Sequence, residues 1–349
     1  MIKFSFSGTS HGEGYSGTIS GLPQGFVFDT EFVNNQLQLR KQGFGRSARQ
    51  CYSDKVVFDG FADKVTVCGD VHFCVANNSA NKQPRQEITA LRSGHTDIVG
   101  QARFSNMSAR QISEISSARN SVCYVVLGAI CKQLLQQKSI LTYSFTQQIG
   151  ANVCKTAFVP NVTDTKDFFA ELRCPSRAVT ESIKKDIELC RQKGDSLGGV
   201  AVVVATGVPM GVGEILPYDR RLDAQISANL VGIPAVKGIE FGLGHAYAKL
   251  NGTQVVDKTE LKDSQIVYST NNCGGIVGGI STGGDIVCKL IVKPVPTVLG
   301  AIAIDSVSGQ LVAQHYERAD TCVVPNVGII AENILAYVIA NQMIEQDLL

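Results

Sequence analysis

Several features that would assign this chain to a broad class of protein are missing from its sequence. The 349 residues carry a formal net charge of +1, so no excess of positive charge indicates a nucleic acid or a membrane surface as partner. No apolar run approaches the roughly 20 residues that a membrane-spanning helix needs. The first residues, MIKFSFSGTSHGEG, lack the basic and then apolar pattern of a signal peptide. We therefore expect a cytoplasmic protein without nucleic-acid or membrane partners.

Cysteine is abundant, but the cysteine pairs that commonly bind metals are absent. The chain has 11 cysteines, none of which forms a CxxC pair, and their spacings match no zinc template. We interpret them as reduced thiols, most of them in the core of a cytosolic protein, and expect no metal site.

A dinucleotide-binding fingerprint is also excluded. Residues 12–17 read GEGYSG and satisfy GxGxxG, but that pattern is meaningful only between a strand and a helix. Residues 18–21 and then Pro23 follow, and they do not form the start of a helix. The sequence therefore argues against a nicotinamide-dependent oxidoreductase.

The most distinctive feature that is present is the glycine-dense stretch at residues 271–297, NNCGGIVGGISTGGDIVCKLIVKPVPT. Glycine allows positive φ and a close approach of the backbone to another body. The stretch therefore suits contact with a flat or phosphorylated ligand, although a flexible hinge is the alternative. Ile276, Val277 and Ile280 are interleaved with the glycines, and we expect them to anchor the loop on a core.

Hydrophobic periodicity predicts a mixture of helices and strands without a linker or a repeat that would divide the chain. Asp29 or Thr30 can cap a helix that runs to about Gln42 and stops at Gly43, which places Arg40 in the last turn. The other predicted helices cover residues 113–137, 180–193, 219–230 and 326–346. The predicted strands are 3–6, a hairpin of 54–61 and 64–76, the two-sided apolar strand 199–206, the strand-like segment 234–242 and 285–293. Residues 77–105 read as polar and irregular.

Two histidines and a set of arginines are the candidates for chemistry. His11 and His95 lie on glycine-flanked loops, where an imidazole can reach a ligand and transfer protons near neutrality. Either one alone could be an ordinary surface histidine. Arginines that sit among glycines or at helix ends could bind a polyanion through paired contacts, or form a solvated basic face; they are Arg40, Arg46, Arg49, Arg119 and Arg318. Arg318 and Asp320 could be a surface ion pair or a carboxylate held beside a cofactor.

Eight segments resemble, in order and spacing, the motifs of the chorismate synthase family, and they span nearly the whole chain. They are Ser10-His11-Gly12, Arg40 with the loop at residues 43–49, Arg92-Ser93-Gly94-His95-Thr96-Asp97, Ser116-Ser117-Ala118-Arg119, Asp195-Ser196-Leu197-Gly198, IPAVKGIE at 233–240, NNCGGIVGGIS at 271–281 with Lys293-Pro294 and Thr297, and Arg318-Ala319-Asp320-Thr321-Cys322. The resemblance implies an α+β fold, a β-α-β sandwich with helices packed between antiparallel sheets, as a single domain over residues 1–349.

The resemblance also implies an activity. The family is a group of FMN-dependent carbon-oxygen lyases that eliminate phosphate from 5-enolpyruvylshikimate 3-phosphate to give chorismate, a step of the shikimate pathway of aromatic amino-acid biosynthesis. It implies reduced FMN as cofactor, NADPH as a possible reductant, a small anionic substrate and a homotetramer. A substrate with two carboxylates and a phosphate suits the arginines, and the proton transfers suit the histidines.

Carried over residue by residue, the resemblance implies a role for each site position. His11 would protonate the departing phosphate, His95 the flavin, and Asp320 would help a flavin nitrogen to act as base. Arg40, Arg46, Arg49 and Arg119 would hold substrate anions, and Arg40 and Arg46 match positions linked to NADPH in some members. The positions that match FMN contacts are Ile115, Ser116, Ser117, Pro234, Ala235, Gly278, Lys293, Pro294, Val295, Pro296, Thr297 and Arg318.

The chain departs from the family pattern mainly beside the expected flavin. Ile115 stands where an arginine is usual, and Asn120-Ser121 replaces Glu-Thr. Thr9 stands where glutamate is common, Ala319 replaces a frequent histidine, Thr282 replaces asparagine or serine, and residues 50–54 lack the usual acidic residue. These departures leave an alternative open, a homologue with weakened or no catalysis that only binds a flavin or an anion.

Overall fold

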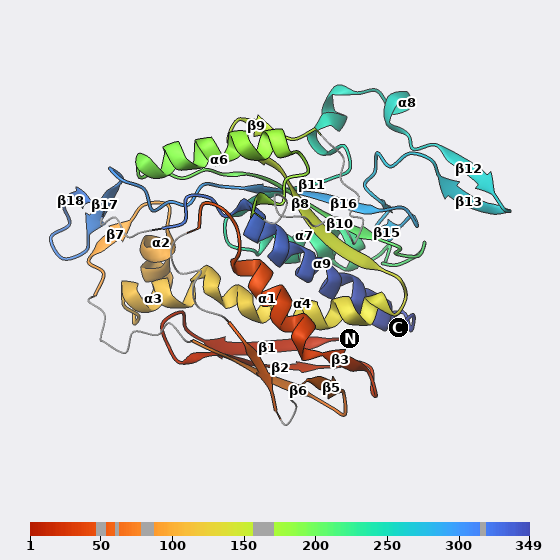
Figure 1. Cartoon of the computed structure of the whole chain (residues 1–349), viewed down its shortest axis with the longest axis horizontal. Helices are drawn as coiled ribbons and strands as arrows, with labels where there is room; N and C mark the ends of the chain where they lie inside the picture. The colour runs from red at the N-terminus through yellow and green to blue at the C-terminus, as the bar shows by residue number, and fades with distance from the viewer. Residues whose placement is uncertain (47–53, 60–62, 78–86, 156–170, 315–318) are drawn as a thin grey trace.

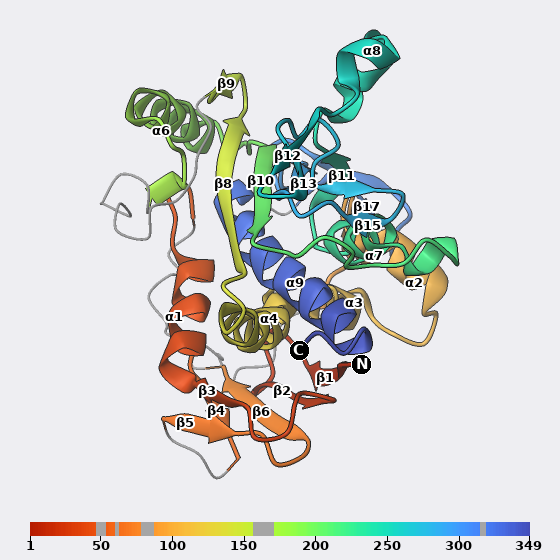
Figure 2. The ribbon, with the colours of Figure 1, turned by 90° about the vertical axis from the view of Figure 1, so that its right-hand side faces the viewer.

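Three helices lie between two antiparallel sheets in the computed structural model of the protein (Figure 1 and Figure 2). The structure describes residues 1–46, 54–59, 63–77, 87–155, 171–314 and 319–349. The three central helices are α1 (Thr30–Lys41), α4 (Ser121–Gln136) and α9 (Val324–Glu345). This layering confirms the predicted β-α-β sandwich.

The two sheets of the sandwich differ in size, and all their strand pairs are antiparallel. The smaller sheet has four strands in the order β1 (Lys3–Gly8), β2 (Gly14–Ser20), β6 (Val71–Ala76) and β4 (Val56–Phe58). The larger sheet has five in the order β11 (Val236–Phe241), β16 (Ile286–Val292), β10 (Gly199–Thr206), β8 (Leu141–Ile149) and β9 (Asn152–Val153).

Smaller elements surround the sandwich. A three-stranded sheet has the order β18 (Leu311–Ala313), β17 (Ile302–Asp305) and β7 (Ala90–Arg92), and two-stranded pairs join β3 (Val27–Asp29) to β5 (Lys64–Thr66), β12 (Thr259–Lys262) to β13 (Gln265–Tyr268), and β14 (Ile276–Val277) to β15 (Ile280–Ser281). The outer helices are α2 (Thr96–Arg103), α3 (Ala109–Ile115), α6 (Arg177–Gln192), α7 (Leu222–Val231) and α8 (Gly252–Val255), with 3-10 turns at Ala118–Asn120, Tyr218–Arg220 and Gly244–Lys249.

Helix α9 is the centre of the core. It packs on α4 and on strands β8 and β10, and it meets α4 where Gly128 faces the backbone of Asn333. A Cβ atom at Gly128 would lie 2.2 Å from the carbonyl oxygen of Asn333, so this close crossing requires glycine. By length and composition α9 could cross a membrane, but 83% of its apolar window is buried inside the fold. Core packing therefore accounts for its apolar character.

A buried charge cluster ties the larger sheet to the central helices. Glu332 of α9 accepts hydrogen bonds from Lys132 Nζ at 2.7 Å, Ser144 Oγ at 2.7 Å and Arg173 Nη2 at 2.9 Å. The Glu332 side chain is 4% exposed. Burial alone raises the pKa of this carboxyl, but Lys132 and Arg173 hold the pKa below its ordinary value. The cluster therefore depends on the ionised form of Glu332.

Most elements follow the sequence prediction. The Asp29 side chain accepts a hydrogen bond from the amide of Glu31 at 2.7 Å and caps α1, which ends at Lys41 with Arg40 in its last turn. Strand β10 is central and buried along most of its length, which confirms that both of its faces are covered. Residues 12–17 lead into strand β2 and not into a helix, which confirms the exclusion of a dinucleotide fingerprint. The predictions for α6, α7, β1, β11, β16 and α9 are confirmed within a few residues.

Three predictions about local structure need correction. Residues 64–76 form two strands in different sheets, because β5 pairs with β3 while β6 pairs with β4. Residues 77–105 are not irregular throughout, since they include β7 and α2. The predicted helix 113–137 is three pieces, because α3 ends at Ile115 and a 3-10 turn precedes α4.

The glycine-dense stretch forms a tight hairpin. Gly278 and Gly279 turn β14 into β15 with φ values of +63° and +89°, which favour glycine. Ile276 is buried and anchors the stretch, as expected, whereas Val277 is exposed. Gly274 and Gly275 pack against the protein's own backbone, where a Cβ atom would lie within 2.4 Å of a neighbouring main-chain atom.

The described cysteines form no disulfide. The ten that the structure describes are all free, and six of them are buried, which agrees with the predicted reduced and mostly buried state. Burial raises the pKa of the thiols of Cys123 and Cys322 to about 12.

Candidate active site

His11 lies on the loop between β1 and β2 and contacts two polar side chains. Its Nδ1 atom is 3.0 Å from Ser10 Oγ and 3.6 Å from Glu114 Oε1. Glu114 lies in the last turn of α3, and its carbonyl oxygen also accepts from the Ser10 amide at 3.4 Å. A quarter of the His11 side chain is exposed, so solvent or a ligand can reach part of the imidazole.

His95 is anchored more tightly, by the fully buried carboxylate of Asp97. The His95 Nδ1 atom lies 2.6 Å from Asp97 Oδ1 and 3.1 Å from Arg92 Nη2. Because a carboxylate only accepts, we assign the proton of the shorter contact to Nδ1. Arg92 donates through Nε to Asp97 Oδ2 at 2.7 Å and through Nη2 to Oδ1 at 3.0 Å. The same Nη2 atom lies 2.9 Å from Ser113 Oγ. Burial alone raises the pKa of Asp97, but His95 and Arg92 hold it well below its usual range.

A second group of predicted residues surrounds one buried carboxylate, Asp54. Arg40 donates from Nη2 to Asp54 Oδ2 at 2.6 Å, and Arg40 Nη1 donates to Ser121 Oγ at 3.2 Å. Arg119 Nη2 lies 3.4 Å and Lys41 Nζ 3.9 Å from Asp54 Oδ1. Residues 50–54 lack the acidic residue that is usual in the family that the chain resembles, and no role was predicted for Asp54, which is the carboxylate that these cations share. Sequence reasoning missed this residue.

Arg46 and Asp320 form a third pair. Arg46 Nη1 lies 2.6 Å from Asp320 Oδ2, and each side chain is about one-fifth exposed, at 20% and 22%. The two loops are also joined through their backbones, because the amide of Thr321 donates to the carbonyl of Gly45 at 2.8 Å. The pair therefore links two residues to which the family resemblance gives different roles, Arg46 on the substrate side and Asp320 on the flavin side. Two further predicted residues, Arg49 and Arg318, lie outside the described residues.

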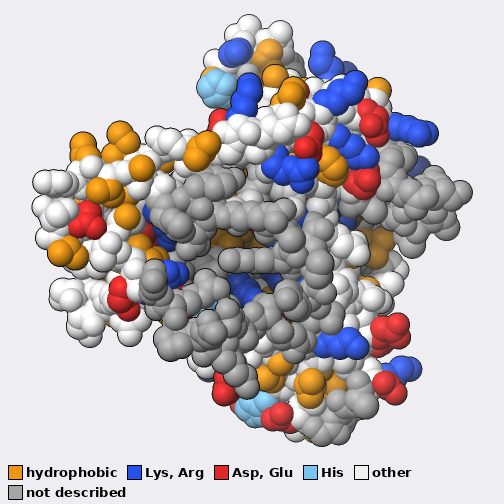
Figure 3. All heavy atoms as spheres, turned by 60° about the vertical axis from the view of Figure 1, so that its left-hand side comes forward, with side chains coloured by type: hydrophobic (Ala, Val, Ile, Leu, Met, Phe, Trp, Pro, Cys, Tyr) orange, Lys and Arg blue, Asp and Glu red, His pale blue; other side chains and the backbone are white. Residues whose placement is uncertain are grey.

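Among the described residues, these two clusters carry more positive than negative charge. Four cations, Arg40, Lys41, Arg46 and Arg119, face the two carboxylates of Asp54 and Asp320. Burial lowers the pKa of Arg40, Asp54 raises it, and the charges of Arg46 and Arg119 lower it again, so these arginines lie near one another. Figure 3 shows Lys and Arg side chains at the bottom of a hollow on one face of the molecule. Such a site suits a ligand with two or more negative charges.

The segment from Lys293 to Thr297 meets the His95 loop directly. Lys293 Nζ donates to the carbonyl of Gly94 at 3.0 Å, and the Lys293 amide donates to the carbonyl of Ala235 at 2.9 Å. Ala235 has the unusual φ of +74°, which turns the chain between α7 and β11 toward this segment. Ser196 Oγ donates a hydrogen bond to the carbonyl of Val295 at 2.6 Å. The predicted residues of this group, Pro234, Ala235, Lys293, Pro294, Val295, Pro296 and Thr297, are exposed or half-buried beside the His95 loop.

Ile115, Ser116 and Ser117 lie where α3 ends, between the two histidine loops. Ile115 is 41% exposed and is followed by Ser116, whose amide closes the helix through the carbonyl of Ile112. The Ser117 side chain accepts from the amide of Arg119 at 3.4 Å. The end of α3 thus presents an apolar side chain and two hydroxyl groups.

Gly278 is not brought next to the histidines within the chain. It is exposed at the tip of the β14–β15 hairpin, where an added Cβ would meet nothing within 4 Å. Figure 1 shows β15 and β7 at opposite ends of the molecule, and His95 follows β7 closely. The role of Gly278 stays a prediction.

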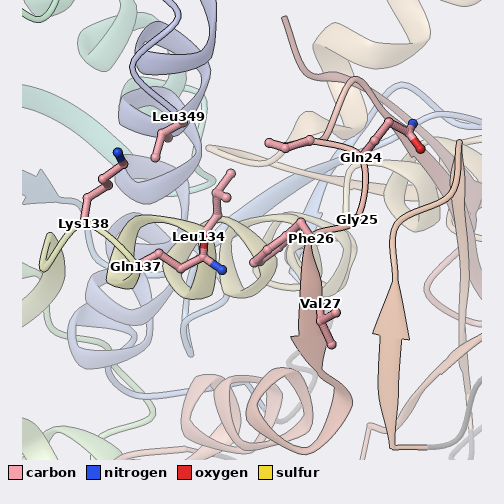
Figure 4. A pocket seen from close by; sticks show the side chains of 9 residues that line it. Gln24, Gly25, Phe26, Val27, Leu134, Gln137, Lys138 and Leu349 are labelled. Atoms are coloured by element: carbon pink, nitrogen blue, oxygen red, sulfur yellow. The ribbon is translucent and has the colours of Figure 1, made fainter.

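Two cavities lie elsewhere on the described surface. One of about 380 Å³ opens between the start of β3 and the end of α4 (Figure 4). It is lined by Pro23, Gln24, Gly25, Phe26, Val27, Leu134, Gln137, Lys138 and Leu349. A second of about 400 Å³ lies beside Arg221 and Asp223. Neither cavity is lined by a predicted site residue. In the described part of the chain, no three His, Cys, Asp or Glu side chains are grouped so that they could hold a metal.

Sequence reasoning named the histidines but assigned no role to the residues that hold them. Arg92 and Asp97 belong to the same family-like motif as His95. The spacing of His95 and Asp97 by two residues could have indicated a carboxylate–imidazole pair. Ser113 and Glu114 carried no comparable signal, because their partners are distant in sequence.

Comparisons with known proteins identify the family of the chain. The model of the family described as chorismate synthase matches residues 2–344. A chorismate synthase from Caldicellulosiruptor bescii is 32% identical over 365 residues, covering 99% of this chain and 95% of the relative. One from Leifsonia xyli subsp. xyli is 32% identical over 368 residues, covering 99% and 92%. A crystal structure of chorismate synthase superposes with a TM-score of 0.78 at 27% identity, covering 99% of this chain and 92% of that one. On the strength of its sequence, its layered fold and these matches, the chain belongs to the chorismate synthase family.

Proposed function

We propose that this protein is a lyase that eliminates phosphate from 5-enolpyruvylshikimate 3-phosphate to give chorismate, with reduced FMN as cofactor. The observation that carries the proposal is the excess of positive charge around Asp54 and Asp320, in a chain that also holds two accessible loop histidines. The substrate has two carboxylates and a phosphate, and these negative groups would complement the cations of the described clusters. Relatives of the same family, named chorismate synthase, support this reading.

The arginines would hold the substrate's anionic groups. The Nε atoms of Arg40 and Arg46 are buried and make no hydrogen bond to any of the described residues. Buried donors of this kind favour an acceptor, and a carboxylate or phosphate oxygen is a strong one. Arg119, on the turn before α4, adds a third guanidinium. Arg49 is proposed for the same role by position alone.

Proton transfer would use both imidazoles. Because Nδ1 of His11 faces Ser10 and Glu114, we assign proton donation to the leaving phosphate to Nε2. Asp97 holds Nδ1 of His95, so that ring also presents Nε2. His95 would act on the flavin side, next to Lys293 and the segment that follows it.

The residues beside His95 fit a flavin. Gln314 is 6% exposed, its Nε2 atom donates to the carbonyl of Pro296 at 3.5 Å, and its Oε1 atom has no partner among the described residues. An acceptor of this kind suits a ring N–H, and the exposed face of Ile115 suits a flat ring. When bound, reduced FMN would supply an electron-rich ring with a nitrogen that can serve as a base. Asp320, which Arg46 holds in place, would help that nitrogen to act as the base.

Several finer statements are part of the proposal. NADPH would be the reductant at Arg40 and Arg46, the protein would act as a cytoplasmic homotetramer, and residues 1–349 would be one domain. Size-exclusion chromatography with light scattering tests the tetramer, and flavin reduction by NADPH without dithionite tests the reductant. Nothing in the comparisons favours the alternative of a homologue that only binds a flavin or an anion.

Phosphate release from 5-enolpyruvylshikimate 3-phosphate, measured anaerobically with dithionite-reduced FMN, tests the function. His11→Ala and His95→Ala should each lower turnover by roughly 10²–10⁴-fold, as expected for a lost general acid. His245→Ala is the control, because His245 is exposed on the turn at Gly244–Lys249. An inactive wild type would reject the proposed function, and near-normal turnover in both variants would reject the roles of the histidines.

A further inference from the structure

The last turn of α3 reaches both histidine loops through two neighbouring side chains. Ser113 Oγ lies 2.9 Å from Arg92 Nη2, on the side of His95. Glu114 Oε1 lies 3.6 Å from Nδ1 of His11. Consecutive residues of an α-helix point about 100° apart, so one turn can serve two loops on different sides.

The contact on the His95 side is a continuous series of hydrogen bonds. Ser113 accepts from Arg92, Arg92 binds both oxygens of Asp97, and Asp97 accepts from Nδ1 of His95. Asp97 is fully buried, and the Arg92 side chain is 12% exposed, so solvent does little to weaken these bonds. The amide of Arg92 also donates to Asp97 Oδ2 at 3.2 Å. A change at Ser113 therefore releases one end of a guanidinium whose other contacts fix the carboxylate beside His95.

The contact on the His11 side combines main chain and side chain. The amide of Ser10 donates to the carbonyl of Glu114 at 3.4 Å, and the Glu114 carboxylate faces the imidazole of His11. Ser10 Oγ faces the same ring nitrogen at 3.0 Å. The loop is thus docked on α3 through its backbone, while Glu114 and Ser10 together set the direction of the ring.

The turn itself is rigidly held. Ser108 and Gln111 form a capping box at the start of α3. Ile112 is 1% exposed and packs on Gly100 of α2, where an added Cβ would lie 2.3 Å from Ile112 Cγ2. Helix α2 begins directly after His95, so the packing of α2 on α3 fixes the distance between the two loops.

We propose that Ser113 and Glu114 are positioning residues that orient His95 and His11, respectively, from one rigid turn. The proposal rests on the proposed function, because it takes both imidazoles as the groups that transfer protons. It goes further, because it holds that the last turn of α3 sets the orientation of both imidazoles. In this proposal Ser113 and Glu114 do not act on the reacting atoms themselves; each acts through the ring that it orients.

The test compares Ser113→Ala and Glu114→Gln with the wild type. The matched controls are Ser182→Ala on α6, a helical serine bonded only to its own helix among described contacts, and Glu260→Gln on β12, in a hairpin that projects from the body (Figure 1). We expect kcat to fall about 10- to 100-fold in each test variant, the effect of losing a contact to a charged group, with KM near the wild-type value. Ser113→Thr, which keeps the hydroxyl, should restore kcat, and Glu114→Asp should restore part of it.

A second readout needs neither substrate nor flavin. The ring nitrogens of the five histidines can be followed by ¹⁵N NMR of the ligand-free protein. Ser113→Ala should shift the signals of His95 and leave those of His11, while Glu114→Gln should do the opposite. Thermal unfolding of every variant shows whether it is folded, and the threonine and aspartate variants carry the test if the others do not fold.

The outcomes separate the two proposals. An inactive wild type would reject the proposed function, whereas the NMR shifts would still test the positioning. An active wild type whose test variants keep full kcat, or whose ring signals do not move, would overturn the role of α3. So would equal shifts at both histidines in both variants, because they would indicate a general loss of structure.

Discussion

Replacing Asp54 by asparagine tests whether one buried carboxylate holds the basic cluster together. Its Oδ2 atom accepts from Arg40 at 2.6 Å, and its Oδ1 atom faces Arg119 at 3.4 Å and Lys41 at 3.9 Å. Asparagine has nearly the same size, but it is uncharged and one of its two terminal groups only donates. Whichever way the amide turns, its NH₂ group faces a cation, because cations lie on both sides.

The magnitude follows from burial. The Asp54 side chain is 4% exposed and that of Arg40 is 8% exposed. Removing one partner of a buried ion pair costs about 3–5 kcal/mol, because the remaining charge is left without compensation. That is a large part of the about 5–15 kcal/mol that stabilises a typical domain. For a chain of 349 residues, we therefore expect the Tm of Asp54→Asn to be lower by about 5 °C.

The assay is thermal unfolding at low ionic strength, with and without inorganic phosphate. Asp263→Asn is the control, because Asp263 is exposed in the turn between β12 and β13. Phosphate should stabilise Asp54→Asn more than the wild type, because its oxygens replace the lost carboxylate between the cations. Wild-type stability of Asp54→Asn, or the same phosphate effect in the control, would refute the reasoning.

Three further predictions concern the flavin side and the core. Ile115→Arg should tighten FMN binding about 10- to 100-fold, because it adds charged donors where isoleucine has none; fluorescence titration against Ile115→Leu measures this, and equal affinities would contradict it. Gly128→Ala should destabilise the protein by about 3 kcal/mol in urea unfolding, because the new Cβ overlaps the Asn333 backbone and outweighs a helix-propensity gain of about 1 kcal/mol. Glu332→Gln should cost about 3–5 kcal/mol at neutral pH, since it removes the buried partner of Lys132. The folded-state pKa of Glu332 lies below its ordinary value of 4.5. The stability that ionised Glu332 contributes is therefore complete above pH 4.5 and is lost as the pH falls through the lower folded-state pKa. Acid unfolding of the glutamine variant should depend less on pH than that of the wild type, and identical profiles would count against the cluster.

Elements with strong local signals could be predicted from the sequence. The Asp29 cap and the apolar face define α1, and the near-continuous apolar composition of β10 and α9 identifies them as buried. Motif order and spacing also located both histidine loops. In each of these cases the information lies within one short stretch of chain, so no knowledge of distant partners is needed.

The break between α3 and α4 could not be predicted from periodicity, because the apolar spacing continues across it. Ser117 accepts a hydrogen bond from the amide of Arg119, and a serine that binds the nearby backbone competes with the helical bond. The cluster at Asp54 was missed for another reason. Arg119 is 65 residues away in sequence, and no pattern within either segment indicates that the fold joins them.

The arginines of the site share a structural device, since three of them are each bound by an aspartate. The pairs are Arg40–Asp54, Arg46–Asp320 and Arg92–Asp97, at 2.6, 2.6 and 2.7 Å. A free arginine side chain has about 2 kcal/mol of rotamer entropy, which a ligand would otherwise have to overcome on binding. An aspartate removes that cost in advance and occupies some of the five N–H donors, which leaves the others for a ligand. Lysine could not serve both purposes, because its single ammonium lacks a planar fork that binds two partners in fixed directions. The same pairing would have different consequences at different positions. Under the proposed function it would leave donors of Arg40 and Arg46 directed at substrate anions, whereas at Arg92 the bound aspartate fixes the imidazole of His95.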